Sequence, residues 1–218
     1  MAKFYIINVI EIYVKLVYTI IVIQSCKGEI MKKVYIVTTF TGTLLSCLIK
    51  RVSKTPYAHV SIALNLDLKP MYSFGRLNPK TPIFAGFVEE NINEGLYAIR
   101  ENTMCRVYSL DVTDSQYDNL KQNIIRVANN RKEYYYDVKG LVYLSMNKSR
   151  KKDNKYVCSN FVADMLEKSD INILDKPSHK VKPNDFYNLE NFTLEYEGLL
   201  SDYPMRHNLN YLQVANSE

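Results

Sequence analysis

Cys158 and His59 are the two side chains whose surroundings in the sequence best suit nucleophilic chemistry. Cys158 is the second residue of a segment, residues 157–168, whose apolar residues recur at helical spacing. The predicted helix carries Cys158 in its first turn, on the same inward face as Phe161 and Val162. Its N-terminus would favour a thiolate and offer N–H groups to an oxyanion. The alternative is a small cysteine that is simply buried in the core.

His59 lies in an alternating segment, residues 57–64, that predicts a β-strand. One face of this strand is apolar, whereas His59 shares the other face with the small residues Ser61 and Ala63. The two other histidines of the chain stand in polar, loop-like stretches. A nucleophile and its base must meet in space and not along the chain, so His59 and Cys158 form a candidate catalytic pair.

The order of these two segments resembles a known family. Residues 57–64 (YAHVSIAL) followed by 156–162 (YVCSNFV) resemble the permuted papain-fold branch of the NlpC-type superfamily, often called YiiX/YaeF-like. Distant cousins of that branch include lecithin:retinol acyltransferase. Residues 182–187 (KPNDFY) are similar to a Pro-x-Asp turn that the group often carries after its catalytic helix. The resemblance covers roughly residues 33 to 190, and its two main motifs are short.

The resemblance implies an α+β, circularly permuted papain-like (NlpC-type) fold. In such a fold an antiparallel sheet packs against helices, and the catalytic cysteine stands at a helix N-terminus. His59 would take the thiol proton and later protonate the leaving group. Cys158 would attack a carbonyl carbon to give a thioester, which water or another nucleophile would resolve.

The remaining site residues are less clearly marked. Related proteins often orient the histidine with a carboxylate or amide on the next strand, but residues 71–76 (MYSFGR) hold neither. Ser73 would share the face of His59 and is the predicted third residue. Three fallback residues for this role are Asn65, Asn78 and Glu89. Two further residues are predicted to bind the oxyanion or the substrate, namely Tyr57 and Ser159.

The pattern of the remaining chain predicts elements that could position this pair. Strands are expected at residues 33–39, 71–75, 84–90, 103–111 and 192–199. Helices are expected at residues 43–54, 137–144 and 183–189, and from Thr113, as the N-cap, to about Asn130. Residues 78–82 and the basic stretch 148–155 are expected to be loops. No repeat or linker divides residues 31–218, so a single domain is predicted there.

Residues 1–30 are predicted to be a hydrophobic segment outside that domain, and three interpretations remain open. A membrane anchor is opposed by Glu11 and Lys15 in the middle of the apolar stretch. A lipoprotein signal would end at Cys26, although Gln24 fits poorly. An over-extended start is favoured by Met31, which is followed by two lysines and the first predicted strand. The protein would be cytoplasmic in this last case, and membrane-attached or exported otherwise.

Composition excludes several classes of function. Of 218 residues, 47% are hydrophobic and 23% charged, which is typical of a globular protein. The net charge of +5 is modest and no helix carries a basic stripe, so nucleic-acid binding is not expected. The four cysteines form no CxxC pair, so neither a metal site, a disulfide framework nor a cofactor is predicted.

The leading hypothesis is therefore a thiol hydrolase that cleaves an amide or ester bond. Its substrate would be a peptide, a peptidoglycan stem peptide or an acyl group. The alternatives are a non-catalytic ligand-binding module that keeps the papain-like fold, a lipid acyltransferase, and a structural protein in which Cys158 belongs to the core. The sequence does not specify the substrate or the oligomeric state.

Overall fold

The computed structural model describes residues 31–42, 56–78, 81–146, 148, 151–187 and 189–203. The described residues from Lys32 onward belong to one compact unit. The expectations for residues 1–30 and for a helix at residues 43–54 lie outside the described residues. Among the described residues, no helix has the length and apolar character needed to cross a bilayer.

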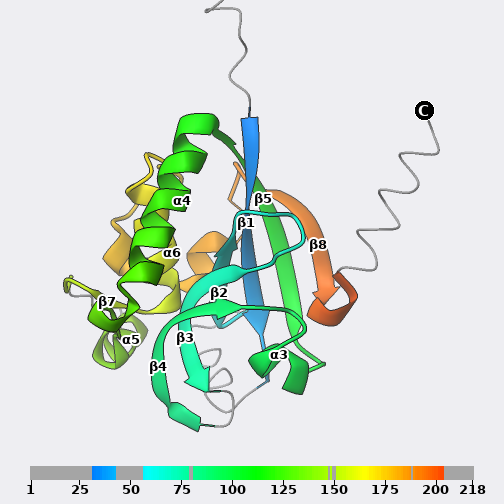
Figure 1. Ribbon diagram of the computed structural model, residues 1–218, viewed down its shortest axis with the longest axis vertical. Helices are drawn as coiled ribbons and strands as arrows, with labels where there is room; N and C mark the ends of the chain where they lie inside the picture. Colours follow the sequence, from blue (N-terminus) through cyan, green and yellow to red (C-terminus); the bar gives the residue numbers. More distant parts are fainter. Residues whose placement is uncertain are drawn as a thin grey trace, which may run out of the picture. The chain divides into compact units, whose positions relative to one another are not determined.

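Six strands form the main sheet in the order β4-β3-β2-β1-β5-β8 (Figure 1). They are β1 (Met31–Phe40), β2 (His59–Ala63), β3 (Met71–Asn78), β4 (Thr81–Glu90), β5 (Met104–Thr113) and β8 (Thr193–Leu199). Within this sheet the pairs β1–β2, β2–β3, β3–β4 and β5–β8 are antiparallel. The molecule is therefore an α+β protein with an antiparallel sheet, as predicted.

The helices are α3 (Gly95–Ile99), α4 (Asp114–Asn129), α5 (Val138–Ser145) and α6 (Cys158–Glu167). A small parallel pair, β6 (Tyr135–Tyr136) and β7 (Lys155–Tyr156), lies before α5 and α6 in the chain. Short 3-10 turns occupy Arg131–Glu133, Ser178–Lys180, Pro183–Phe186 and Leu200–Asp202.

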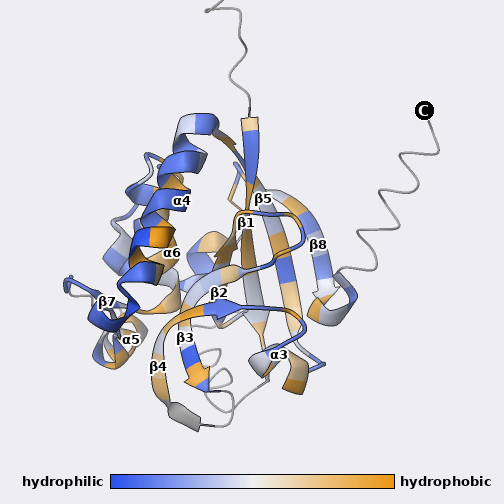
Figure 2. Cartoon of the chain, in the orientation of Figure 1, coloured by the Kyte–Doolittle hydropathy of each residue, from blue (hydrophilic) through white to orange (hydrophobic). Residues whose placement is uncertain are grey.

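β1 is buried on both faces because each set of its alternating side chains enters a different core. Val34 and Ile36 pack in the larger core with buried residues of α4 and α6. Tyr35 and Val37 pack in a smaller core on the opposite face, with residues of α3 and β5. In Figure 2 the hydrophobic residues gather where α4, α6 and the strands meet, and the outer side of α4 is hydrophilic.

The start of α4 follows the sequence closely. Thr113 is the N-cap, accepting a hydrogen bond from the Gln116 backbone while the Gln116 side chain accepts one from the Thr113 backbone. This reciprocal capping satisfies two N–H groups that the helix itself leaves without partners. On its inner face α4 buries Leu120, Ile124 and Val127, as the spacing predicts.

Several predicted boundaries need correction. The expected loop at residues 78–82 is mostly strand, because β3 continues to Asn78 and β4 begins at Thr81. The helix expected at residues 183–189 is only the 3-10 turn Pro183–Phe186. There the Asp185 side chain accepts a hydrogen bond from the Lys182 backbone and caps the start of the turn, but the turn ends at Tyr187, whose backbone is extended. The five-residue α3 has no counterpart in the prediction.

An aromatic cluster holds the first turns of α6 against β3 and β4. Phe161 of α6 lies 5.2 Å from Phe74 and 5.7 Å from Phe87, measured between ring centroids. Tyr156 of β7 completes the cluster, with its ring 5.2 Å from Phe74. Because Cys158 lies between Tyr156 and Phe161 in the chain, these contacts fix where the thiol sits relative to the sheet.

Truncation of Phe161 tests the importance of this cluster. Phe161→Ala is expected to lower the free energy of unfolding by about 3–5 kcal/mol, because it removes a fully buried ring and leaves a cavity. Leu194→Ala, at a half-exposed position of β8, is the control and is expected to change it by no more than about 0.5 kcal/mol. Chemical denaturation measures both, and equal losses would contradict the role given to the cluster.

Candidate active site

Cys158 is the first residue of α6, as predicted, and follows the extended N-cap residue Val157. Its thiol is 6% exposed and lies at the wall of a cavity of about 690 Å³. The predicted inward stripe is also present, since Phe161, Val162 and Met165 are buried on the same helix. The cysteine thus combines burial, access to a cavity and a helix N-terminus.

The residues after Cys158 anchor this helix end. The hydroxyl of Ser159 donates to the carbonyl oxygen of Val181 at 2.7 Å, and the Asn160 amide donates to the same carbonyl and to that of Ser178. The Ser159 side chain is fully buried in this role. The structure therefore does not bring the Ser159 hydroxyl to the cavity, although the N–H groups of the first helical turn have no partner within the helix.

His59, the first residue of β2, makes a direct contact with Glu90, the last residue of β4. The distance between His59 Nε2 and Glu90 Oε1 is 2.9 Å. Both side chains are mostly buried, with 21% and 16% of their surface exposed. A hydrogen bond of this length to a charged group in a sheltered place restrains the imidazole strongly.

Glu90 is itself held by two hydroxyl groups. Ser61 of β2 donates to Glu90 Oε2, and Tyr97 of α3 donates to the same oxygen at 3.3 Å. The Tyr97 hydroxyl also lies 3.4 Å from Thr39 Oγ1 of β1. The short helix that the sequence did not reveal therefore supplies a donor that fixes the carboxylate.

The charges of His59 and Glu90 stabilise each other. Burial alone lowers the pKa of His59, but the Glu90 carboxylate, its hydrogen bond to the ring and the nearby Cys158 outweigh burial and hold the pKa well above 6.5. Burial alone raises the pKa of Glu90, but His59 and the Ser61 and Tyr97 hydroxyls bring it below 4.5. The folded protein thus stabilises the imidazolium that His59 becomes when it takes up a proton.

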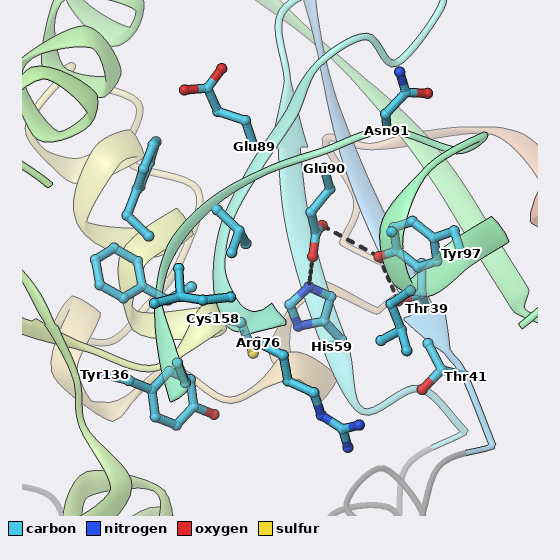
Figure 3. Close-up of a pocket in the computed structure, with 18 of the residues that line it drawn as sticks. Thr39, Thr41, His59, Arg76, Glu89, Glu90, Asn91, Tyr97, Tyr136 and Cys158 are labelled. Carbon is cyan, nitrogen blue, oxygen red and sulfur yellow. Dashed lines mark hydrogen bonds and ion pairs between the residues drawn. The ribbon is translucent and has the colours of Figure 1, made fainter. Parts of the chain in front are cut away.

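The hydrogen bonds also define how the imidazole is used. A carboxylate only accepts hydrogen bonds, so the Nε2 atom that faces Glu90 carries a proton. Nδ1 is the ring nitrogen that remains available to Cys158, whose proximity also raises the pKa of His59. Figure 3 shows Cys158 beside the imidazole, on the side away from Glu90. The two predicted residues are therefore brought together, and Nδ1 of His59 can exchange a proton with the thiol.

Tyr136 of β6 is a further polar residue of the cavity that sequence reasoning missed. It lines the cavity together with Cys158 and Arg76 (Figure 3). Burial and the proximity of Cys158 raise the pKa of the Tyr136 hydroxyl, while Arg76 lowers it in part. Tyr136 is therefore a neutral hydroxyl donor next to the thiol. Its position depends on β6, a two-residue strand without a distinct sequence pattern.

The predicted third residue, Ser73, is corrected by the structure. Ser73 is fully buried, and its hydroxyl donates to the carbonyl oxygen of Val60 at 2.7 Å. That bond ties β3 to β2 and leaves the imidazole to another partner. Glu90 takes the orienting position instead.

Glu90 was missed because it lies two strands after the histidine. In the register of β3 and β4, Ser73 faces Val88, so Glu90 points to the same side of the sheet as Ser73, and Glu89 to the other. Of the three fallbacks, Glu89 is thus one residue away from the observed partner, whereas Asn65 follows the end of β2 and Asn78 is the last residue of β3. The sequence signal that could have indicated this partner is the pair Glu89-Glu90 at the end of the predicted strand.

The predicted role of Tyr57 is also not supported by its position. Its hydroxyl donates to Glu197 Oε1 of β8 at 3.2 Å, and Tyr57 is not among the described residues that line the cavity. Burial and the charge of Glu197 raise the Tyr57 pKa to about 12. Cys105 is fully buried, and that burial raises the pKa of its thiol to about 12.

The described residues contain no cluster of three or more His, Cys, Asp or Glu side chains arranged to hold a metal ion. Neither protein-family models nor curated proteins give a match to this chain.

Replacement of Glu90 tests the central contact. Glu90→Gln keeps the shape of the side chain but removes its charge, so the imidazolium loses its stabilising partner and the pKa of His59 should fall. NMR titration of the His59 ring measures this shift. Glu89→Gln is the matched control, because it removes the same charge from the adjacent residue. Equal shifts in the two variants would show that only the general field of the cavity matters.

Proposed function

We propose that this protein is a thiol hydrolase that cleaves an amide or ester bond through Cys158, His59 and Glu90. The observation that carries the proposal is the 2.9 Å bond from His59 Nε2 to Glu90, because it leaves the other ring nitrogen for Cys158. A nucleophile, a base and a group that orients the base are the three parts of such a site. All three face one cavity.

The reaction would proceed in two halves. Nδ1 of His59 takes the thiol proton, and the sulfur of Cys158 attacks the carbonyl carbon, so a C–S bond forms and the carbonyl oxygen gains negative charge. Collapse of this intermediate breaks the C–N or C–O bond, and the leaving group takes the proton from Nδ1. Water, deprotonated by the same nitrogen, then attacks the thioester, and the proton returns to the released sulfur.

Glu90 would contribute by keeping the imidazole in place and by stabilising the imidazolium that each half-reaction forms. The developing oxyanion would be met by backbone N–H groups at the start of α6 and by the hydroxyl of Tyr136. Tyr136 takes the role first predicted for Tyr57, since its hydroxyl lies in the cavity with Cys158.

A permuted papain-like fold is part of the same proposal. It is supported by the order of the site along the chain, where the histidine strand β2 precedes the cysteine helix α6. The packing of α6 on the sheet through Phe74 and Phe161 is also consistent with that fold. The rival interpretation is a binding module that keeps the fold without catalysis. The presence of all three groups, Cys158, His59 and Glu90, at one cavity favours an enzyme over a binding module.

Selective alkylation tests the proposed ion pair. Iodoacetamide below neutral pH is expected to label Cys158 faster than a free cysteine, because His59 accepts the thiol proton. The buried Cys105 should remain unlabelled in the folded protein. Peptide mapping by mass spectrometry locates the label, and His59→Ala should abolish the excess rate. A rate for Cys158 no higher than that of free cysteine would refute the catalytic assignment.

The oxyanion assignment is tested with two tyrosine variants. Tyr136→Phe is expected to lower kcat for a soluble activated ester by about 100-fold with little change in KM, because the lost donor acts on charge formed in the transition state. Tyr57→Phe, which removes a hydroxyl bonded to Glu197, should leave kcat close to that of the parent. Steady-state kinetics distinguish them, and the reverse order would return the role to Tyr57.

A further inference from the structure

Helix α5 exposes apolar side chains along one face. Val138, Val142 and Met146, at the C-cap, follow one another at four-residue spacing, and 63%, 54% and 57% of their surfaces are exposed. Residues at this spacing lie in a row on a helix. A row of large apolar residues left in water is unusual for a monomeric soluble protein and marks a surface that binds something.

This row continues into the candidate active site. Val138 and Leu141 of α5 line the same cavity as Cys158, and so does Leu77 near the end of β3. Leu77 and Phe84 of the neighbouring β4 are also more than half exposed. We name these exposed apolar residues of α5, together with Leu77 and Phe84, the α5 face. Through Val138 and Leu77 the α5 face therefore borders the cavity, whose lining also includes the charged Arg76 and Arg131.

The charge around α5 is strongly positive. Residues 131–155 contain eight Lys and Arg but only three Asp and Glu, a net charge of +5. The whole chain also has a net charge of +5, so the remaining residues sum to zero. Lys139 lies within α5, and the exposed Lys148 and Lys151 follow it. The excess positive charge of the protein is therefore concentrated next to the α5 face.

Apolar side chains flanked by basic ones are suited to an anionic lipid surface. Six of the eight basic residues in this segment are lysines. Lysine is depleted in protein–protein interfaces, whereas clusters of lysine attract anionic lipid headgroups. The charge composition therefore favours a membrane over a protein partner.

We propose that the α5 face docks on an anionic lipid bilayer. Docking there would bring the cavity of Cys158 to the membrane surface, because Val138 belongs to the α5 face and also lines that cavity. The docking involves the outer surface of the protein and does not depend on the proposed hydrolase.

Vesicle sedimentation of the full chain tests the docking. Vesicles of phosphatidylcholine alone are compared with vesicles in which part of the lipid is phosphatidylglycerol, and binding should be stronger to the second. The double variant Val142→Asp/Met146→Asp should bind anionic vesicles at least about tenfold more weakly, since two apolar contacts become two negative charges. Every variant keeps residues 1–30, so any contribution of that segment is common to all.

A matched control comes from α4, where Ile125 is also partly exposed. Ile125→Asp should bind vesicles as the parent does. A second pair, Lys148→Glu/Lys151→Glu, should weaken binding to anionic vesicles by about tenfold or more and leave binding to neutral vesicles unchanged. Far-UV circular dichroism verifies that each variant is folded.

The outcomes separate docking from catalysis. Undiminished vesicle binding by Val142→Asp/Met146→Asp, or an equal loss in Ile125→Asp, would overturn the docking proposal, and a protein partner would become the better occupant. Hydrolysis of a soluble short-chain ester, measured in parallel, should depend on Cys158 but not on vesicles. Absence of that hydrolysis would refute the proposed function while leaving the vesicle result valid.

Discussion

The contact between His59 and Glu90 is the constraint on which the rest of the site depends. The bond of 2.9 Å assigns the Nε2 proton, leaves Nδ1 to the Cys158 thiol and keeps the imidazole charged more easily than in water. Two mostly buried charges are costly unless they are paired and bonded further. The hydroxyls of Ser61 and Tyr97 meet that requirement at the second carboxylate oxygen.

Three parts of the fold cooperate to form this contact. The sheet brings the start of β2 next to the end of β4, although β3 lies between them. Helix α3 adds Tyr97 from the smaller core, and α6 brings Cys158 from the larger one. The aromatic contacts of Phe161 hold the thiol over the edge of the sheet. The reacting groups thus come from both faces of the sheet and are fixed by two separate cores.

The elements and the pairing of His59 with Cys158 could be predicted from sequence because their patterns are local. Alternation identified the strand of His59, and helical spacing placed Cys158 at a helix start. The orienting carboxylate could not be predicted in the same way, since the position of Glu90 depends on the register between β3 and β4. For the same reason Ser73 was assigned a role at His59 while its hydroxyl bonds to a neighbouring strand. Tyr136 could not be predicted because β6 has two residues, too few to show the alternation that marks a strand.

The central proposal is that the sulfur of Cys158 becomes covalently acylated after His59 takes the thiol proton. The most direct measurement is acid quenching of the protein during turnover of an activated ester, followed by intact-mass and peptide analysis. The predicted result is one acyl group bound as a thioester at Cys158, absent in His59→Ala. Continued turnover by Cys158→Ala, or turnover without any acyl adduct on Cys158, would contradict the claim.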